Sequence, residues 1–282
     1  MLIVLLLAAV GLIFGSFVNA LVWRLHEQAE LAEKKGKRSK KAELQKLSIL
    51  RGRSMCPECH HELAAKDLVP VFSWLFLRGK CRYCSKPISW QYPVVELVVA
   101  ALFVISYVAW PKELHGLGLV ELYFFLAFIV GFVALAVYDL KWFLLPDKIV
   151  FPFVGLAVAE LLVSLIFFHA GRPAFWASVW GVLIASGIFF VLYQVSRGTW
   201  IGGGDVKLGL VLGILVGGPL NSLMLLFIAS LLGTLVSLPM LMLGRAGRKT
   251  LIPFGPFLIA ATIIVVLFGS HFIDWLNAFI VG

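Results

Sequence analysis

Long apolar stretches separated by short polar ones run along almost the whole chain. A helix needs about 17 to 25 apolar residues to cross about 30 Å of hydrocarbon. Stretches of that length occupy residues 2–23, 94–110, 119–138, 149–169, 175–195, 220–243 and 252–270. The pattern therefore predicts an all-α polytopic membrane protein.

A shorter apolar stretch, Val206–Val216, is too short for a straight helix that spans the bilayer alone. Counting it as a crossing gives about eight transmembrane helices and places both termini outside. Only Lys112 and Arg172 then lie in outward loops, as the preference of Lys and Arg for the cytoplasmic side requires. The segments expected to face the cytoplasm are 24–92, 139–148, 196–205 and 244–251; the last carries Arg245, Arg248 and Lys249.

Charge is concentrated in one polar segment, residues 24–92, which holds 15 of the 24 Lys and Arg residues but only 7 of the 15 acidic ones. A basic segment can bind nucleic acid, but this one is tethered between apolar spans, and its charge is explained by its cytoplasmic side. We expect its most basic part, 34–46, to be a solvated insert that also meets anionic lipid head groups. The chain as a whole is 61% hydrophobic and 14% charged, which excludes an ordinary soluble domain.

The predicted organisation has three parts. Residues 1–23 form a retained first transmembrane helix, 24–92 form the cytoplasmic segment, and 93–282 form the main membrane domain. Small residues recur about four apart in the first helix, which is typical of close helix packing. They are Gly11, Gly15, Ser16 and Ala20.

All four cysteines lie in the cytoplasmic segment, as 56-CPEC-59 and 81-CRYC-84. Two CxxC pairs at this separation predict a small zinc-ribbon-like domain in which Cys56, Cys59, Cys81 and Cys84 bind one structural Zn²⁺. A redox role, another metal and unligated thiols are the alternatives; disulfides are disfavoured in the reducing cytosol. Because four thiolates fill a tetrahedral shell, we expect His60 and His61 to be surface or neighbouring groups and not ligands.

Three carboxylates from two separate segments are expected at the cytoplasmic membrane face. They are Asp139 and Asp147, in 137-VYDLKWFLLPDKIV-150, and Asp205, in 202-GGGDVKL-208. If Asp139 and Asp205 meet, they can share one proton, so that one acts as base and the other as acid. The glycines before Asp205 would permit close backbone approach and unusual φ values.

A purely structural interpretation of these acids remains open on the residues alone. In that interpretation Asp139 pairs with Lys141, Asp147 caps the next helix, and the glycine run is a loop. Glu160 lies within a predicted span, where we expect no role beyond pairing with a neighbouring helix.

Taken together, the blocks resemble one known family. They are 15-GSFVNALVWRL-25, 69-VPVFSWLFLRGKC-81, 92-YPVVEL-97, 139-DLKWFLLPD-147, 202-GGGDVKL-208 and 252-IPFGPFLIA-260. In this order, and together with the CxxC pairs, they closely resemble bacterial type IV prepilin peptidases, GxGD aspartyl proteases that also N-methylate the cleaved substrate. Presenilin-like proteases share the YD and GxGD pairing but are not known for the other blocks.

The resemblance implies roles for particular residues. Asp139 and Asp205 would be the catalytic pair, with Gly202, Gly204, Asp147 and Lys207 shaping its surroundings. Methyl transfer, with S-adenosylmethionine as donor, would be associated with the cysteine-bearing segment. The methyltransferase candidates are Gly79, Gly15, Asn19 and Glu96.

The resulting hypothesis is an enzyme of the bacterial inner membrane that cleaves the leader of prepilins or pseudopilins and methylates the new N-terminus. Its partners would be these substrates and the lipid bilayer, and not nucleic acid. One alternative is a transporter or channel whose acids line a proton or cation path, with the zinc module as a regulator. It predicts acids at the membrane midplane, whereas these acids cluster at one edge. Another alternative keeps only the methyltransferase, against which the intact aspartates argue.

Overall fold

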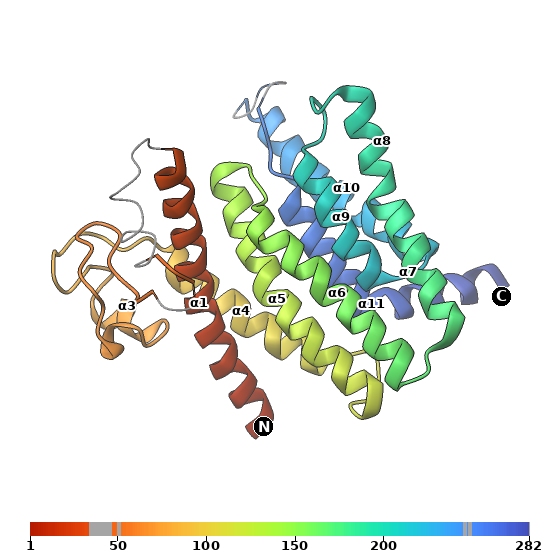
Figure 1. Cartoon of the computed structure of the whole chain (residues 1–282), viewed down its shortest axis with the longest axis horizontal. Helices are drawn as coiled ribbons and strands as arrows, with labels where there is room; N and C mark the ends of the chain where they lie inside the picture. Colours follow the sequence, from red (N-terminus) through yellow and green to blue (C-terminus); the bar gives the residue numbers. More distant parts are fainter. Residues whose placement is uncertain (34–46, 50–51, 245–246, 248–249, 282) are drawn as a thin grey trace. The chain divides into compact units, whose positions relative to one another are not determined.

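The chain is helical throughout the part that the structure describes. The computed structural model describes residues 1–281 except 34–46, 50–51, 245–246 and 248–249 (Figure 1). The helices are α1 (Leu2–Glu33), η1 (Ala65–Asp67), α3 (Phe72–Phe76), α4 (Gln91–Val108), α5 (Gly116–Trp142), α6 (Asp147–Phe167), α7 (Gly171–Ala185), α8 (Gly187–Ser196), α9 (Gly203–Val216), α10 (Pro219–Met242) and α11 (Gly255–Val281). In these described ranges β-structure is limited to two isolated bridges. The chain divides into two compact units, Met1–Tyr107 and Val108–Gly282.

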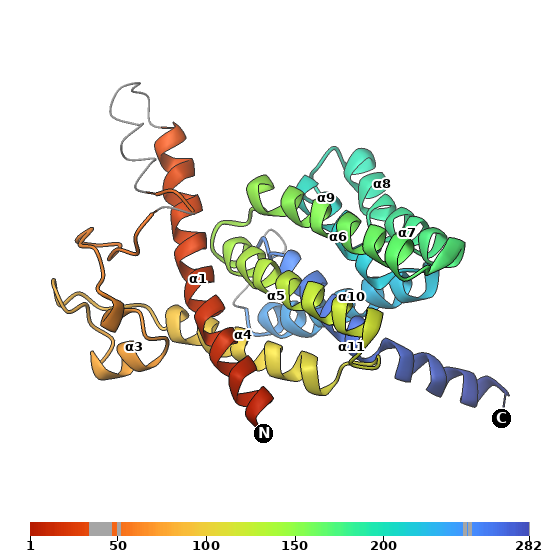
Figure 2. The ribbon, with the colours of Figure 1, turned by 60° about the horizontal axis from the view of Figure 1, so that its bottom comes forward.

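The first unit is built on the crossing of α1 and α4, which both views show (Figures 1 and 2). The predicted small-residue face of α1 makes this contact. A Cβ atom on Gly11 would lie 2.6 Å from Ala100 Cα, and one on Gly15 would lie 2.5 Å from Glu96 Cα. Only glycine lets the two backbones approach this closely, so the predicted packing role of this face is confirmed.

Arg24, nine residues before the end of α1, anchors the polar segment that follows this helix. Arg24 is buried, and its guanidinium donates hydrogen bonds to the carbonyl oxygens of Ser48, Ile49 and Gly52 at 2.9 to 3.2 Å. Because α1 continues to Glu33, the helix extends well past the predicted span end at residue 23. Its last turns are polar and helix-forming, and therefore need no bilayer to remain helical.

The second unit is a helical bundle with α9 inside it. This helix has 14 residues and packs against α6, α7, α8, α10 and α11 (Figure 1). Its side chains Leu208, Val211 and Leu212 have no exposed surface. The short helix is thus enclosed by five neighbouring helices, which explains why an apolar run of this length is stable here.

The closest approach in the bundle joins α7 to α9. A Cβ atom on Gly181 would overlap the carbonyl oxygen of Gly213, and the reverse substitution is equally crowded. Further along the same contact, the hydroxyl of Ser186 donates to the carbonyl oxygen of Val206 at 2.8 Å. Ser186 also separates α7 from α8, so one predicted span, 175–195, is interrupted there.

Among the described residues, seven helices or helix pairs are long and apolar enough to cross a membrane. They include one at every predicted long span, with α7 and α8 counted together as Gly171–Ser196. The predicted fold class, an all-α polytopic membrane protein, is confirmed. The crossing by Val206–Val216 stays a prediction because α9 falls below this length. The basic insert 34–46 and the residues Arg245, Arg248 and Lys249 lie outside the described residues.

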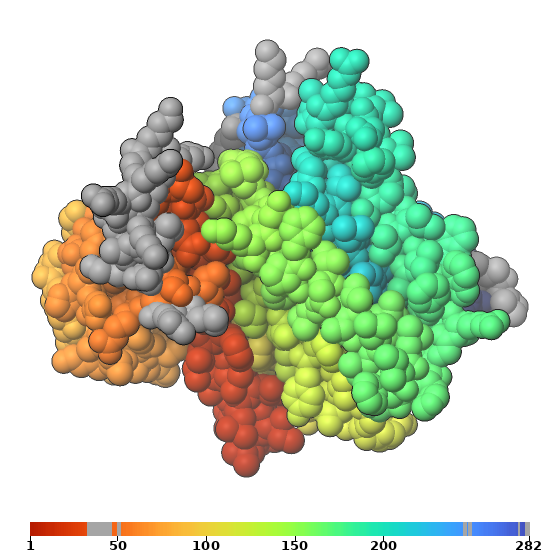
Figure 3. Space-filling model, viewed as in Figure 1, coloured from red at the N-terminus to blue at the C-terminus, as the bar shows by residue number. Residues whose placement is uncertain are grey.

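The face of the second unit that carries α6 is apolar. The green segment of the space-filling view is this helix (Figure 3). Its exposed side chains include Phe151, Val158, Leu162 and Ile166. Exposed apolar side chains of this size suit contact with lipid tails and not with water.

Candidate active site

Asp139 lies in the last turn of α5 and is buried, with 5% of its surface exposed. Its carboxylate oxygen Oδ2 accepts a hydrogen bond of 3.1 Å from the backbone N–H of Gly255, the first residue of α11. A buried carboxylate requires such a donor. The partner comes from a segment more than a hundred residues away along the chain.

Asp205 lies in the first turn of α9, directly after the glycine run. It is close enough to Asp139 for the charges of the two carboxylates to interact. The structure therefore brings together the two aspartates that the sequence proposed as a pair. They come from different helices at the same end of the bundle.

Leu145 packs against two segments of the site: the glycine run before Asp205 and the start of α11, which donates to Asp139. A Cβ atom on Gly204 would lie 3.0 Å from Leu145 Cβ, and one on Gly255 would lie 3.4 Å from Leu145 Cδ2. The expectation of close approach at the glycine run is thus met at Gly204. The expectation of unusual φ values there is wrong: Gly202 has a φ of −72°, and the positive-φ glycines lie elsewhere.

The two remaining residues of the predicted set, Asp147 and Lys207, form an ion pair. The Nζ atom of Lys207 donates to both carboxylate oxygens of Asp147, at 2.7 and 2.9 Å. Since Asp147 begins α6 and Lys207 lies two residues after Asp205, the pair ties α6 to the N-terminal turn of α9. Both side chains are partly exposed, which limits the contribution of the pair to stability.

The structural interpretation of these acids receives no support from the contacts. Asp139 is held by Gly255, while the Nζ atom of Lys141 lies 5.2 Å from the centre of the Trp142 ring. At the start of α6 the capping position is occupied by Pro146, and Asp147 is the first residue of the helix. The pair with Lys141 and the cap by Asp147 are therefore not among the contacts of the described residues, and the catalytic role of these acids stays a prediction.

The four cysteines of the first unit converge on one point. Their sulfur atoms all lie within 4.8 Å of one another, an arrangement that could hold one metal ion. The two CxxC turns have the same backbone pattern. Cys56 N–H donates to the carbonyl of His61 and Cys81 N–H to that of Lys86, at 3.0 and 2.8 Å.

The pKa values of Cys81 and Cys84 differ because the sulfur atoms of the four thiols lie close together. Burial opposes the thiolate of Cys81, but backbone N–H groups of Cys84 and Tyr83 stabilise it and lower the pKa to about 7. For Cys84 the backbone N–H of Lys86 favours the thiolate, yet burial and the neighbouring thiols raise the pKa to about 12. Four thiolates this close would repel one another unless a positive ion were bound.

Asp67 connects the second cysteine pair to the rest of the segment. Its side chain is 3% exposed and accepts hydrogen bonds from Arg82 at 2.7 Å and Tyr83 at 2.9 Å. Burial opposes ionisation, but these donors outweigh it and hold the pKa of Asp67 below its usual value. His60 and His61 are exposed, and His61 stacks on the Tyr83 ring at 3.7 Å. These contacts agree with the expectation that the histidines are surface groups.

The methyltransferase candidates Gly15, Asn19 and Glu96 lie together where α1 crosses α4. Asn19 is buried and donates to the carbonyl oxygen of Tyr92 at 3.0 Å. Glu96 is also buried, and its Oε2 atom accepts from the backbone N–H of Val71 at 2.6 Å. Both polar side chains are thus engaged within the first unit.

Val71 adopts a left-handed φ of 61° immediately before α3. This conformation is strained for a β-branched residue. The hydrogen bond from Val71 to Glu96 therefore compensates for a strained turn. The sequence did not signal this contact, because nothing in a single sequence pairs a loop amide with a glutamate on a distant helix.

Gly79, the fourth candidate, lies on the other side of α3. Its φ of +68° suits glycine, and a Cβ atom there would lie 2.9 Å from the ring of Trp74. Trp74 in turn donates from its indole nitrogen to the carbonyl of Ile88 at 3.1 Å. Glu96 thus holds the residue before α3, and Gly79 lies in the turn after the same short helix.

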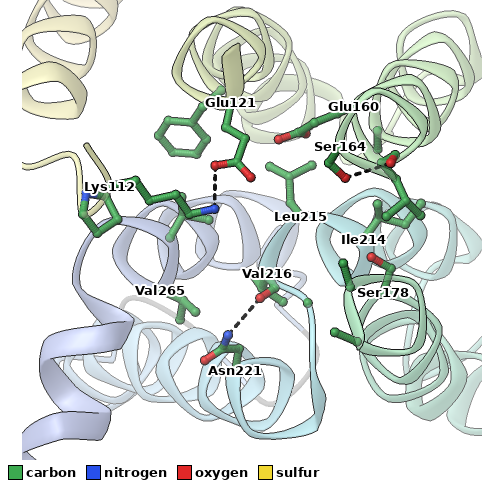
Figure 4. Close-up of a pocket in the computed structure, with 18 of the residues that line it drawn as sticks. Lys112, Glu121, Glu160, Ser164, Ser178, Ile214, Leu215, Val216, Asn221 and Val265 are labelled. Atoms are coloured by element: carbon green, nitrogen blue, oxygen red, sulfur yellow. Dashed lines mark hydrogen bonds and ion pairs between the residues drawn. The ribbon is translucent and has the colours of Figure 1, made fainter. Parts of the chain in front are cut away.

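A cavity of about 450 Å³, lined mostly by apolar residues, opens among the second-unit helices, near the far end of α9 from Asp205 (Figure 4). Glu160 projects into it beside the ion pair of Lys112 and Glu121, whose atoms are 2.6 Å apart. The pairing of Glu160 with a neighbouring helix stays a prediction. The cavity contains Val216, about 16 Å along α9 from Asp205, so it is not the site of the aspartates.

These features define a class of protein: a multi-pass membrane protein with two interacting carboxylates at one end of its helical bundle and a cluster of four thiols in a separate unit. The sequence profile of the bacterial peptidase A24 N-terminal domain matches residues 9–110, and that of the type IV leader peptidase family matches residues 126–238. The chain belongs to the type IV leader peptidase family. No solved structure gave a significant match.

Curated relatives support this assignment over most of the chain. The chain is 32% identical to a prepilin leader peptidase/N-methyltransferase of Bacillus subtilis, covering 81% of this chain and 87% of the relative. It is 31% identical to the protein of that name from Stutzerimonas stutzeri and 32% identical to that from Pseudomonas aeruginosa. In both cases 93% of this chain and 89% of the relative are covered.

The contact between Glu96 and Val71 gives a testable prediction. Replacing Glu96 by alanine leaves the Val71 N–H without its acceptor, at a cost of about 1–3 kcal/mol. We expect faster proteolysis of the segment around α3 and a lower melting temperature. Glu96→Gln keeps a carbonyl acceptor and should behave nearly as the wild type. Equal proteolysis of all three proteins would show that the hydrogen bond does not hold α3.

Proposed function

We propose that the protein cleaves the leader peptide of prepilins or pseudopilins at the cytoplasmic face of the bacterial inner membrane, and that Asp139 and Asp205 do the chemistry. The observation that supports this most is that two carboxylates from α5 and α9 lie within electrostatic reach of each other, one of them held by a backbone donor. Family membership and the names of the relatives supply the substrate class. Under this proposal, 24–92 is cytoplasmic and both termini are external.

Cleavage then follows from a proton shared by the two carboxyls. Two carboxylates that come this near to each other resist being ionised together, so we propose that one aspartate is protonated while the other is ionised. The ionised carboxylate removes a proton from water as its oxygen attacks the scissile carbonyl carbon. The protonated carboxyl first stabilises the carbonyl oxygen and then supplies a proton to the leaving nitrogen as the C–N bond breaks.

The substrate is expected to approach within the bilayer. A prepilin carries an apolar helix after its leader, and such a helix can lie along the lipid-facing spans with its scissile bond at the membrane edge. A deep soluble cleft is then unnecessary. The partners are the prepilin or pseudopilin and the lipid bilayer, with no role for nucleic acid. A transporter would need acids along a path through the membrane, whereas Asp139, Asp147 and Asp205 lie at one end of the bundle.

The dyad is tested by conservative substitution. Asp139→Asn and Asp205→Asn each remove one half of a proton-sharing pair, and each should lower the cleavage rate at least about 100- to 10,000-fold. Cleavage of a prepilin in detergent, followed by mass analysis of the new N-terminus, measures the effect.

Asp147→Asn is the matched control at the same end of the bundle. It weakens only a partly exposed ion pair, so a loss of no more than about fivefold is expected. Near-normal cleavage by either dyad variant would refute the assignment. All three proteins should insert into membranes at wild-type levels.

We further propose that Cys56, Cys59, Cys81 and Cys84 bind one structural Zn²⁺. Four sulfur atoms within 4.8 Å of one another suit the tetrahedral thiolate shell of structural zinc. The ion would hold the two CxxC turns together in a segment with little apolar core. It has no part in peptide hydrolysis.

Metal analysis of the purified protein should give about one zinc per chain, the stoichiometry of a four-thiolate site. A Cys56→Ser, Cys59→Ser double variant should lose the metal, while a His60→Ala, His61→Ala double variant should keep it. A zinc content near zero in protein purified under reducing conditions would contradict the proposal. Loss of the metal in the histidine variant would contradict it as well.

The relatives' name also supports N-methylation of the cleaved substrate, with S-adenosylmethionine as the donor. Of the four candidate residues, Asn19 and Glu96 are buried and engaged in hydrogen bonds within the first unit. Gly15 and Gly79 are required by close contacts. Each of these residues is occupied by contacts within the first unit. We therefore propose that they maintain the conformation of this unit and do not themselves bind the methyl donor.

Methylation and cleavage should be separable, because their candidate residues lie in different compact units. Gly79→Ser places a side chain in a left-handed backbone position and against the Trp74 ring. We expect leader cleavage to remain within about threefold of wild type, an effect well below the loss of a catalytic group. The mature product should lack its N-methyl group by mass.

A pre-cleaved pilin offered to the same variant provides the control. The Gly79→Ser protein should fail to methylate it, whereas Asp139→Asn should methylate it normally. Joint loss of cleavage and methylation in Gly79→Ser would refute separable sites, and normal methylation would remove Gly79 from the set.

A further inference from the structure

The start of α11 contributes to the site of the aspartates although it was given no role from the sequence. It lies beyond residue 238, where the match to the type IV leader peptidase family ends. Gly255 is buried, and its N–H is the group that donates to Asp139 Oδ2 at 3.1 Å. This contact involves the reacting carboxylate itself.

In the first turn of α11, one backbone N–H group remains available to donate to Asp139. Pro256 has no N–H, and the N–H groups of Phe257 and Leu258 both donate to the carbonyl oxygen of Phe254, at 3.1 and 3.2 Å. The remaining N–H of that turn belongs to Gly255. It points at Asp139 from the positive end of a long helix, which is a favourable place for a carboxylate.

Space at Gly255 is as restricted as its hydrogen bonding. A Cβ atom there would lie 2.6 Å from Asp139 Oδ2, and its other near neighbour, Leu145 Cδ2, would be at an ordinary 3.4 Å. The one atom that must move to admit a methyl group is therefore the end of the aspartate side chain. Such a movement costs the fold little and displaces the carboxylate that the reaction uses.

We propose that Gly255 is a positioning residue of the peptidase, fixing one oxygen of Asp139 by its N–H and keeping free the space that the carboxylate occupies. The inference rests on the proposed role of Asp139 in cleavage. It makes α11 a third element of the site, beside the helices that carry the two aspartates.

The test is Gly255→Ala in the full-length protein, assayed with a prepilin. A carboxylate displaced by about 1 Å lowers kcat about 100-fold. We expect KM and the melting temperature to stay close to wild type, because neither the surface that receives the substrate nor the helix packing changes. Gly155→Ala is the matched control, since no atom lies within 4 Å of the added methyl group on α6.

Wild-type kcat in Gly255→Ala would overturn the proposal, as would a loss that appears entirely in KM. If Gly255→Ala fails to insert, Gly255→Ala combined with Asp139→Ala decides the matter. Removing the carboxylate removes the collision, so the double variant should recover the expression and melting temperature of Asp139→Ala alone. If the double variant does not recover them, the added methyl group collides with something other than the Asp139 carboxylate, and the positioning role of Gly255 is refuted.

The Asp139→Asn variant, measured in the same assay, separates this inference from the proposed function. An active Asp139→Asn protein would refute the dyad itself. An inactive Asp139→Asn protein with a fully active Gly255→Ala protein would refute only the role of Gly255.

Discussion

A carboxylate buried among apolar helices must be hydrogen-bonded, and this constraint governs the second unit. A buried acceptor left without a hydrogen-bond donor costs about 1–3 kcal/mol, and more when it is charged. Asp139 avoids this cost through the backbone N–H of Gly255. The contact in turn requires that α11 begin beside the end of α5 and that residue 255 have no side chain. The placement of Leu145, against Gly255 and Gly204, follows from the same crowding.

The short helix α9 completes this arrangement. Its interior position depends on backbone contact with α7, where Gly181 and Gly213 leave no room for side chains. Packing of small residues substitutes for a hydrophobic driving force, which helices in lipid lack. The ion pair of Lys207 and Asp147 fixes the start of α9 relative to α6. Asp205 is thus held near Asp139 chiefly by the packing of α9, to which the partly exposed ion pair adds little.

Much of this could be predicted from the sequence. The apolar runs gave the long helices because bilayer thickness sets their length, and the spacing of Cys56, Cys59, Cys81 and Cys84 predicted their convergence. The glycine run before Asp205 was interpreted correctly as a close approach and incorrectly as a positive-φ turn. The sequence blocks that contain Gly255, Val71 and Glu96 were singled out, but the hydrogen bonds Gly255–Asp139 and Val71–Glu96 could not be foreseen. Both join a backbone N–H to a side chain far along the chain, and a backbone group leaves no residue-type signal in one sequence.

The central claim is that Asp139 and Asp205 act as one proton-sharing unit. The most direct measurement is kcat/KM for prepilin cleavage as a function of pH, on protein shown to remain folded across the range. A pair that needs one ionised and one protonated carboxyl gives a bell-shaped profile, because activity is lost when both are protonated and when both are ionised. Proton sharing by Asp139 and Asp205 therefore predicts a bell-shaped pH profile of kcat/KM. A profile with a single limb, or one independent of pH, would contradict it.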